Sequence, residues 1–149
     1  MNYNERLRVP LRWWAIATMF LASVLLAFLV ATPAWVAFGA TGVLSAGVVA
    51  LFLGYGAARI SVHDGVFTAG RASIPTDLLG AAVALDAAAT HRQAGIDADA
   101  RAYLLLRPYL KRAVFVPIDD PADPVPYWLV STRSPEKLVA ALVSASVPD

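Results

Sequence analysis

Acidic residues and prolines are concentrated in one short stretch, DDPADPVP at residues 119–126. Carboxylates at this density could hold a divalent cation through oxygen ligands, or act as a general acid and base. Each proline, however, removes a backbone donor and fixes φ, and short acids in turns accept backbone N–H groups. We therefore predict a structural loop whose turns are stabilised by Asp119, Asp120 and Asp123.

A second acidic pair, Asp97 and Asp99, lies in the segment GIDADAR. This spacing lacks the glycine and the further acidic positions of a calcium-binding loop, so turn and cap roles are predicted for both residues. The chain has no cysteine and only two histidines, His63 and His91, which argues against a zinc site. No phosphate-binding loop or nucleophile motif appears. We predict no catalytic residue, no metal site and no cofactor.

Basic residues interleaved with tyrosines form the other group that could take part in binding. If these side chains share one face, they could bind anionic lipid headgroups at about 1 kcal/mol per charge near the membrane surface. The alternative is that they are solvated charges at strand edges, where they discourage pairing with other chains. The residues predicted to contact lipid or a partner are Arg101, Arg107, Tyr109, Lys111 and Arg112.

A long uncharged tract in the sequence indicates where in the cell these groups lie. No charged residue occurs between Arg12 and Arg59, a stretch of 46 residues in a chain of 149. Only 15% of the residues are charged and the mean hydropathy is +0.60, whereas soluble domains average about 25% charged. The tract accommodates two membrane-spanning helices of about 20 residues each. Pro33 divides it, so we predict a transmembrane hairpin over residues 13–58 with spans at 13–31 and 34–58.

Arginines flank this hairpin on one side only. Arg6, Arg8 and Arg12 precede the first span, Arg59 and Arg71 follow the second, and the connection ATPAW carries no charge. The positive-inside rule therefore predicts a multi-pass protein of the inner or plasma membrane with both termini in the cytoplasm. The first apolar stretch is longer than that of a signal peptide and lacks an A-x-A pattern, so we predict that it is not cleaved.

Small residues recur every four positions along the second span, and such a ladder lets a neighbouring helix approach closely. The first helix is the simplest partner, and a helix of another membrane protein is the alternative. No ionisable side chain lies inside either span, so the usual marker of a proton or ion path is missing. The predicted packing residues are Gly42, Ala46, Ala50, Gly54 and Ala58.

Residues 59–149 are predicted to form a separate cytoplasmic domain, preceded by a cytoplasmic segment at 1–12. The domain has nine Lys and Arg against ten Asp and Glu, a balance that does not indicate a nucleic-acid partner. The dipeptide Asp64-Gly65 between apolar positions predicts a strand, a tight turn and a strand. We expect a third strand within 78–86, where a short helix is the alternative, followed by a loop over 89–100. Further strands are predicted at 102–107, 113–118 and 127–132.

The last predicted element is an amphipathic helix. Ser134 suits the N-cap and Pro135 the first helical position, and the apolar stripe consists of Leu138, Val139, Leu142 and Val143. Together these patterns predict a membrane α+β protein, in which the helical hairpin is followed by a small antiparallel β-barrel or sheet. The C-terminal helix would close this domain, in the manner of a pleckstrin-homology-like fold.

Four segments carry a resemblance to a known family: YNERLRVPLRWW, GRASIP, GIDADARAYLLLRPYLKRAV and DPADPVPYWLVSTRSPEKL. Together they resemble an actinobacterial family of small membrane proteins that is catalogued only as a domain of unknown function. The resemblance implies two membrane helices and a small cytoplasmic domain. It implies no activity and supplies no catalytic residue.

Two classes of function are compatible with these patterns. The favoured one is a non-catalytic membrane adaptor or scaffold, whose cytoplasmic domain binds a protein partner or the anionic lipid surface. Its partners would be membrane lipids and another membrane or cytoplasmic protein. The alternative is a membrane enzyme that acts on a lipid-linked or nucleotide substrate through Asp97 and Asp99 or through the aspartates of the loop at 119–126. The small size of the domain favours the adaptor, because an enzyme needs convergent polar groups in a pocket.

Overall fold

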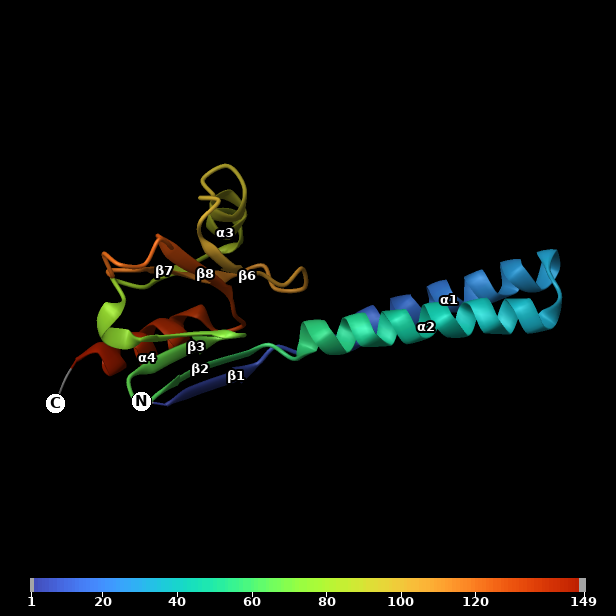
Figure 1. Cartoon of the computed structure of the whole chain (residues 1–149), viewed down its shortest axis with the longest axis horizontal. Helices are drawn as coiled ribbons and strands as arrows, with labels where there is room; N and C mark the ends of the chain where they lie inside the picture. Colours follow the sequence, from blue (N-terminus) through green and yellow to red (C-terminus); the bar gives the residue numbers. More distant parts are fainter. Residues whose placement is uncertain (1, 148–149) are drawn as a thin grey trace. The chain divides into compact units, whose positions relative to one another are not determined.

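A computed structural model describes residues 2–147 and separates into two compact units (Figure 1). The helical unit spans Arg8–Ala57. The β unit contains both ends of the chain, up to Leu7 and from Ala58 onward. The β unit is therefore discontinuous in sequence, and the helical unit is inserted between its first strand and the rest.

The helical unit consists of α1 (Leu11–Ala31) and α2 (Ala34–Gly56). The two predicted helices are confirmed, and both are long and apolar enough to cross a membrane. Pro33 precedes α2 as its N-cap residue, as expected from its fixed φ and missing donor. Almost no side chain of either helix is buried.

An aromatic cluster joins the two helices near their ends. The ring of Phe52 meets the edge of Trp14 at a centroid distance of 5.0 Å and lies 6.4 Å from Trp13. Ala37 and Thr41, near the start of α2, are the buried residues of this helix. The face of α2 that packs against α1 therefore runs through Ala37, Thr41 and Phe52.

The first sheet of the β unit is antiparallel, with its strands in the order β1-β2-β3-β4. The predicted turn at Asp64-Gly65 is confirmed, because both residues have the positive φ of a tight hairpin, 49° and 70°. The strands are β1 (Tyr3–Arg6), β2 (Arg59–His63), β3 (Val66–Ala69) and β4 (Ala72–Pro75).

Strand β1 lies in the N-terminal segment, for which the sequence indicated no regular structure. It pairs with β2 so that Arg6 lies opposite Arg59, and the Leu7 amide donates to the Ala58 carbonyl at 3.1 Å. The chain therefore enters α1 and returns from α2 at the same end of one strand pair.

The second sheet has the order β5-β7-β8-β6. The strands expected within 102–107, 113–118 and 127–132 are confirmed. The all-antiparallel arrangement is wrong, because β6 runs parallel to β8. The closed barrel is also wrong: both sheets are open, because β1 does not pair with β4 and β5 does not pair with β6. Its strands are β5 (Val83–Leu85), β6 (Tyr103–Leu105), β7 (Ala113–Pro117) and β8 (Tyr127–Ser131).

A short helix replaces part of the loop predicted at 89–100. Helix α3 (Ala87–Ala94) begins after Asp86, whose carboxylate accepts the Ala89 amide at 2.7 Å. An acidic N-cap before consecutive alanines is a helix signal that the sequence analysis missed. Only Val83–Leu85 of the strand expected within 78–86 forms, and a 3-10 turn, η1 (Thr76–Leu78), precedes it.

Helix α4 (Pro135–Ser146) contacts both sheets and begins where predicted, with Pro135 in its first turn. Leu138 and Leu142 are buried, whereas Val143 is 54% exposed, so the apolar stripe is narrower than predicted. The two sheets pack through Phe67 and Trp128, whose ring centroids lie 5.6 Å apart.

Candidate functional site

One end of the β unit collects basic side chains from strand ends and from the connections between strands. Arg6 and Arg59 are opposite each other in the β1-β2 pair. The Gly70 amide donates to the Arg59 carbonyl at 2.8 Å, which places the β3-β4 turn and its Arg71 beside Arg59. This is the end at which the chain leaves for α1 and returns from α2.

The connection between β6 and β7, residues 106–112, is held at the same end. The Tyr103 hydroxyl donates to the Ala69 carbonyl at 2.8 Å, which joins β6 to the last residue of β3. The Arg107 amide donates to Ser131 Oγ at 3.2 Å at the end of β8, and the Thr132 amide donates to the Arg112 carbonyl at 3.2 Å. Both ends of this loop are therefore tied to the end of β8.

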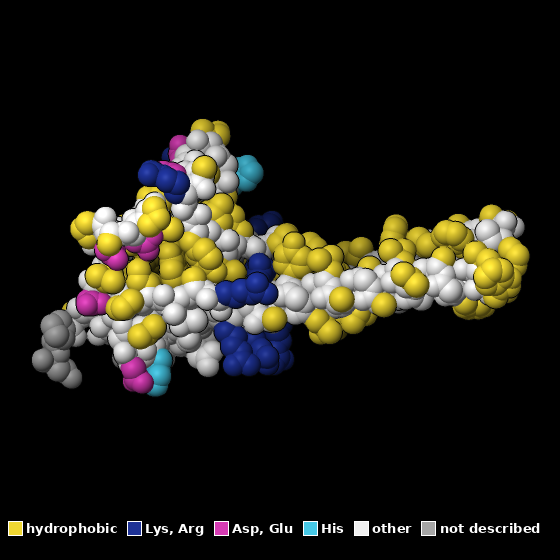
Figure 2. Space-filling view, viewed as in Figure 1, with side chains coloured by type: hydrophobic (Ala, Val, Ile, Leu, Met, Phe, Trp, Pro, Cys, Tyr) yellow, Lys and Arg dark blue, Asp and Glu magenta, His cyan; other side chains and the backbone are white. Residues whose placement is uncertain are grey.

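The guanidinium of Arg112 connects the loop to the start of α4. It donates to the Arg133 carbonyl at 2.9 Å and to Glu136 at 3.2 Å. Figure 2 shows the Lys and Arg side chains gathered at this end of the β unit. We call this surface the basic end, and its members are Arg6, Arg59, Arg71, Arg107, Lys111, Arg112 and Arg133.

Tyr109, which the sequence assigned to this site, lies half-buried within the basic end. Burial raises the pKa of its phenol, while the positive charges of Arg107 and Arg133 act in the opposite direction. The tyrosine therefore remains neutral at physiological pH and gives the basic end an amphipathic ring.

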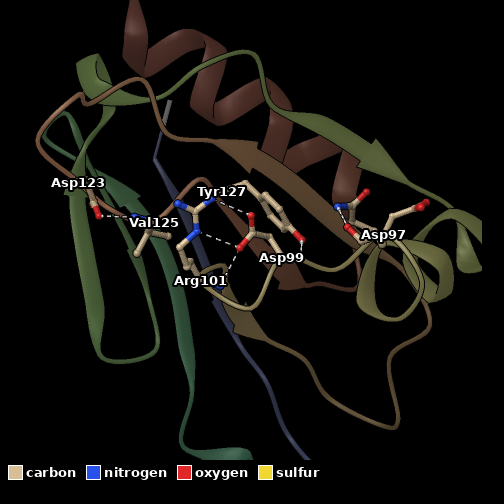
Figure 3. Close-up of polar contacts among 7 residues, drawn as sticks. Asp97, Asp99, Arg101, Asp123, Val125 and Tyr127 are labelled. Carbon is tan, nitrogen blue, oxygen red and sulfur yellow. Dashed lines mark hydrogen bonds and ion pairs between the residues drawn. The ribbon is translucent and has the colours of Figure 1, made fainter.

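Arg101, the fifth residue predicted for this site, lies elsewhere. It precedes β6, at the opposite end of that strand from Arg107. Its guanidinium forms an ion pair with Asp99 at 3.1 Å, and the Asp99 amide donates to the Tyr127 hydroxyl oxygen at 2.9 Å (Figure 3). Hydrogen bonds from Arg101 lower the pKa of Asp99, and the same contact raises the pKa of Arg101. The structure thus brings Arg107, Lys111 and Arg112 together and separates Arg101 from them.

Glu5 anchors the basic end from within β1. One carboxylate oxygen accepts the Thr132 hydroxyl at 2.5 Å and the Tyr3 hydroxyl at 2.7 Å, and the other accepts the Arg133 amide at 3.0 Å. Burial, more than the neighbouring carboxylate, raises the pKa of Tyr3 to about 12. The strand that leads into α1 is therefore bonded to the junction of β8 and α4.

Aspartates occupy the opposite end of the β unit. Asp64 lies in the β2-β3 turn, and the Thr76 amide donates to the Gly65 carbonyl at 2.8 Å, which places Asp77 nearby. The Asp119 amide donates to the Leu78 carbonyl at 2.8 Å, so the loop at 119–126 lies at this end too. We call this surface the acidic end. These aspartates are therefore separated along the strands from the residues of the basic end.

The loop at 119–126 confirms two of the three predicted turn roles. Asp120 accepts the Ala122 amide and Asp123 accepts the Val125 amide, both at 2.9 Å. Among residues 2–147, the Asp119 carboxylate has neither a hydrogen bond nor an ion pair. Asp119 therefore differs from its neighbours, because its side chain does not serve the turn.

The small-residue ladder of α2 does not face α1, so that part of the prediction is wrong. At Gly42 and at Gly54, no neighbouring atom lies within 4 Å of the place that a Cβ would occupy. Ala46 and Ala50 are exposed as well. Ala58 lies beyond the helix and is buried in the β unit. The reason is geometric, since the packed face runs through Ala37, Thr41 and Phe52 on another side of the helix.

In the sequence, Arg6, Arg59 and Arg71 indicate only the topology, and no local pattern shows that they belong to one surface with Arg133. A partial signal exists for Arg71, because a tight antiparallel turn places the residues of its two strand ends side by side. Glu5 and Thr132 had no such signal, since a contact across 127 positions leaves no local pattern.

Residues 2–142 match the family described as "Protein of unknown function (DUF3093)". No curated protein matches the chain, and no solved structure matches it.

Proposed function

We propose that this chain, which belongs to the DUF3093 family of proteins of unknown function, is a membrane-anchored, non-catalytic adaptor. The two apolar helices span the cell membrane, and both termini and the β unit lie in the cytoplasm. The basic end of the β unit binds the anionic headgroups of the inner leaflet. A pleckstrin-homology-like relationship remains a prediction from the order of the elements, and it carries no weight in this proposal.

The position of the basic end, where the β unit connects to both helices, is the observation that carries this proposal. Arg6 is five residues before the start of α1, and Arg59 is three residues after the end of α2. A fully extended chain spans at most about 18 Å over five residues and about 11 Å over three. If the helices cross a bilayer, the basic end is therefore held near its surface however the two units are oriented.

The electrostatics of this end favour binding to an anionic surface. Arg6, Arg59, Arg71 and Lys111 are exposed, and they form no ion pair within the described chain. Each such charge contributes about 1 kcal/mol near an anionic leaflet. The acidic end lies at the other end of the strands, where repulsion from the same leaflet is screened within about 10 Å at 0.1 M salt.

The contacts of the aspartates support binding rather than catalysis. Asp99 is paired with Arg101, Asp97 lies 3.8 Å from Arg92, and Asp120 and Asp123 are occupied by backbone amides of their own loop. These carboxylates do not converge on a common point, which the alternative of a membrane enzyme would require.

The exposed ladder of α2 supports a partner within the membrane. Glycine and alanine surfaces let helix backbones approach closely, and Gly42 and Gly54 face away from the residues that contact α1. We assign this face to a helix of another membrane protein. The adaptor would thus hold a membrane partner through α2 and the lipid surface through its basic end.

Reconstitution of the full chain in nanodiscs tests the lipid contact. Hydrogen exchange is measured for residues 106–112 in discs of phosphatidylcholine and in discs that also contain phosphatidylglycerol. We expect slower exchange of this loop in the anionic discs, and loss of that difference at high salt. Replacement of Arg107, Lys111 and Arg112 by Gln should abolish the difference at low salt as well.

A matched control uses basic residues outside the basic end. Arg92→Gln combined with Arg101→Gln removes two positive charges from the region of α3 and should leave the lipid effect unchanged. Equal exchange of the 106–112 loop in the two kinds of disc would contradict the proposal. An equal effect of both sets of substitutions would show that only net charge matters.

A further inference from the structure

A pocket of about 360 Å³ opens at the acidic end, between α4, β7 and the segment that precedes β5. Polar and apolar atoms from these three elements line it about equally. Its volume lies at the lower end of the range for small-molecule sites. The lining includes Leu79, Gly80, Val116, Asp119, Leu142 and Val143.

The polar part of the pocket is negative. The carboxylate of Asp119 has no partner in the described chain and lies over Gly80, where an added Cβ would come within 3.2 Å of its oxygen. Ser146, in the last turn of α4, also lines the pocket. The carboxyl end of a helix carries a partial negative charge. Among the described residues, no Lys or Arg lines the pocket.

We propose that this pocket binds an organic cation with an aliphatic body. The charged ammonium or guanidinium group bonds to the Asp119 carboxylate near the end of α4, and the carbon chain lies against Leu79 and Val143, which line the pocket and are accessible. A charge-assisted hydrogen bond to a carboxylate is about twice as strong as a neutral one. An anionic ligand would meet repulsion from the same groups.

Two sources can supply this chemistry, a free aliphatic amine or the side chain of a basic residue in a partner protein. Both place one cation at the end of a chain of several methylene groups. The acidic end also carries Asp64 and Asp77 outside the pocket, and their charges add attraction for either source. This inference does not depend on lipid binding, because the pocket and the basic end lie at opposite ends of the β unit.

The test uses the full chain in detergent micelles, with n-hexylammonium as the probe and n-hexanol and hexanoate as matched ligands. Binding is followed by changes in the NMR resonances of labelled methyl groups of Val116 and Leu142. We expect saturable binding of hexylammonium, binding of hexanol weaker by about tenfold, and still weaker binding of hexanoate.

Two variants locate the site. Asp119→Asn should weaken hexylammonium binding by about tenfold and leave hexanol binding unchanged. Val143→Phe fills the pocket from an exposed position and should abolish binding of both ligands. Asp77→Asn is the control, because it removes a charge from the acidic end without altering the pocket lining.

A short peptide with one lysine between leucines distinguishes the two sources. Displacement of hexylammonium by the peptide at lower concentration supports a basic segment of a partner, and stronger binding of the free amine supports a small molecule. Equal binding of hexylammonium and hexanol, or equal effects of Asp119→Asn and Asp77→Asn, would overturn the proposal. Absence of saturable hexylammonium binding would overturn it as well.

Discussion

Glu5 accepts a hydrogen bond of 2.5 Å from Thr132, a residue 127 positions further along the chain. The bond joins the strand before α1 to the residue after β8, and the Arg133 amide adds a second bond to the same carboxylate. Residues 2–7 are thus an integral part of the β unit. A fragment that begins at Arg59 would lack β1 and leave the hydroxyl of Thr132 without this acceptor.

Replacement of Glu5 should destabilise the β unit. Glu5→Ala removes the carboxylate that accepts from Thr132, Tyr3 and the Arg133 amide, so we expect a loss of about 1 to 3 kcal/mol in the free energy of unfolding. Glu136→Ala is the control, because it removes a carboxylate from an exposed ion pair, which contributes about 0 to 1 kcal/mol. Urea unfolding followed by near-UV circular dichroism measures both. Equal losses in the two variants would show that the Glu5 contacts add nothing beyond charge.

Tyr3 should make the stability of the β unit depend on alkaline pH. Its folded-state pKa is about 12, above the value of about 10 in an unfolded chain. The unfolded state therefore loses this proton first, and the stabilisation is complete below pH 10 and lost as pH rises toward 12. Melting temperatures between pH 9 and pH 11 should fall less steeply in Tyr3→Phe than in the native chain. An equal fall of the melting temperature with pH in the two proteins would contradict the raised pKa of Tyr3.

Phe52 should stabilise the helical hairpin more than its exposed neighbours do. Phe52→Ala removes the edge contacts with Trp13 and Trp14, which are worth about 0.5 to 1.5 kcal/mol for each aromatic pair. Leu53→Ala is the matched control, because Leu53 is 63% exposed. Gly54→Leu should also leave the hairpin intact, since its surroundings are open. Unfolding by sodium dodecyl sulfate in mixed micelles measures the stability of the hairpin in these three variants. Greater loss in Gly54→Leu than in Phe52→Ala would restore the ladder to the α1-α2 contact.

The two termini are expected in the cytoplasm. Single cysteines are introduced at Ala34, between the helices, and at Ser146, near the end of α4, in a chain that otherwise has no cysteine. An impermeant maleimide applied to intact cells should label Ala34→Cys and not Ser146→Cys. Labelling of both positions after permeabilisation confirms that each is reactive. The reverse pattern in intact cells would invert the proposed topology.

Local patterns in the sequence determined most of the secondary structure. The apolar tract and Pro33 predict α1 and α2, Asp64-Gly65 predicts the first turn, and Ser134-Pro135 predicts the start of α4. Each of these signals acts within a few residues, through a missing donor, a positive φ or a helix cap. The failure at α3 was also local, because the cap at Asp86 was present and overlooked.

Tertiary structure alone decided which residues share a surface. The sequence placed Arg101 with Arg107, yet a strand separates them, and it placed the ladder of α2 against α1, yet the helix presents another face. Packing of the two sheets and the register of their strands brought Arg6 and Arg59 beside Arg133 instead. Such contacts join residues that are far apart in the sequence, and the packing of the whole core decides which of them form. No spacing within the sequence therefore encodes them.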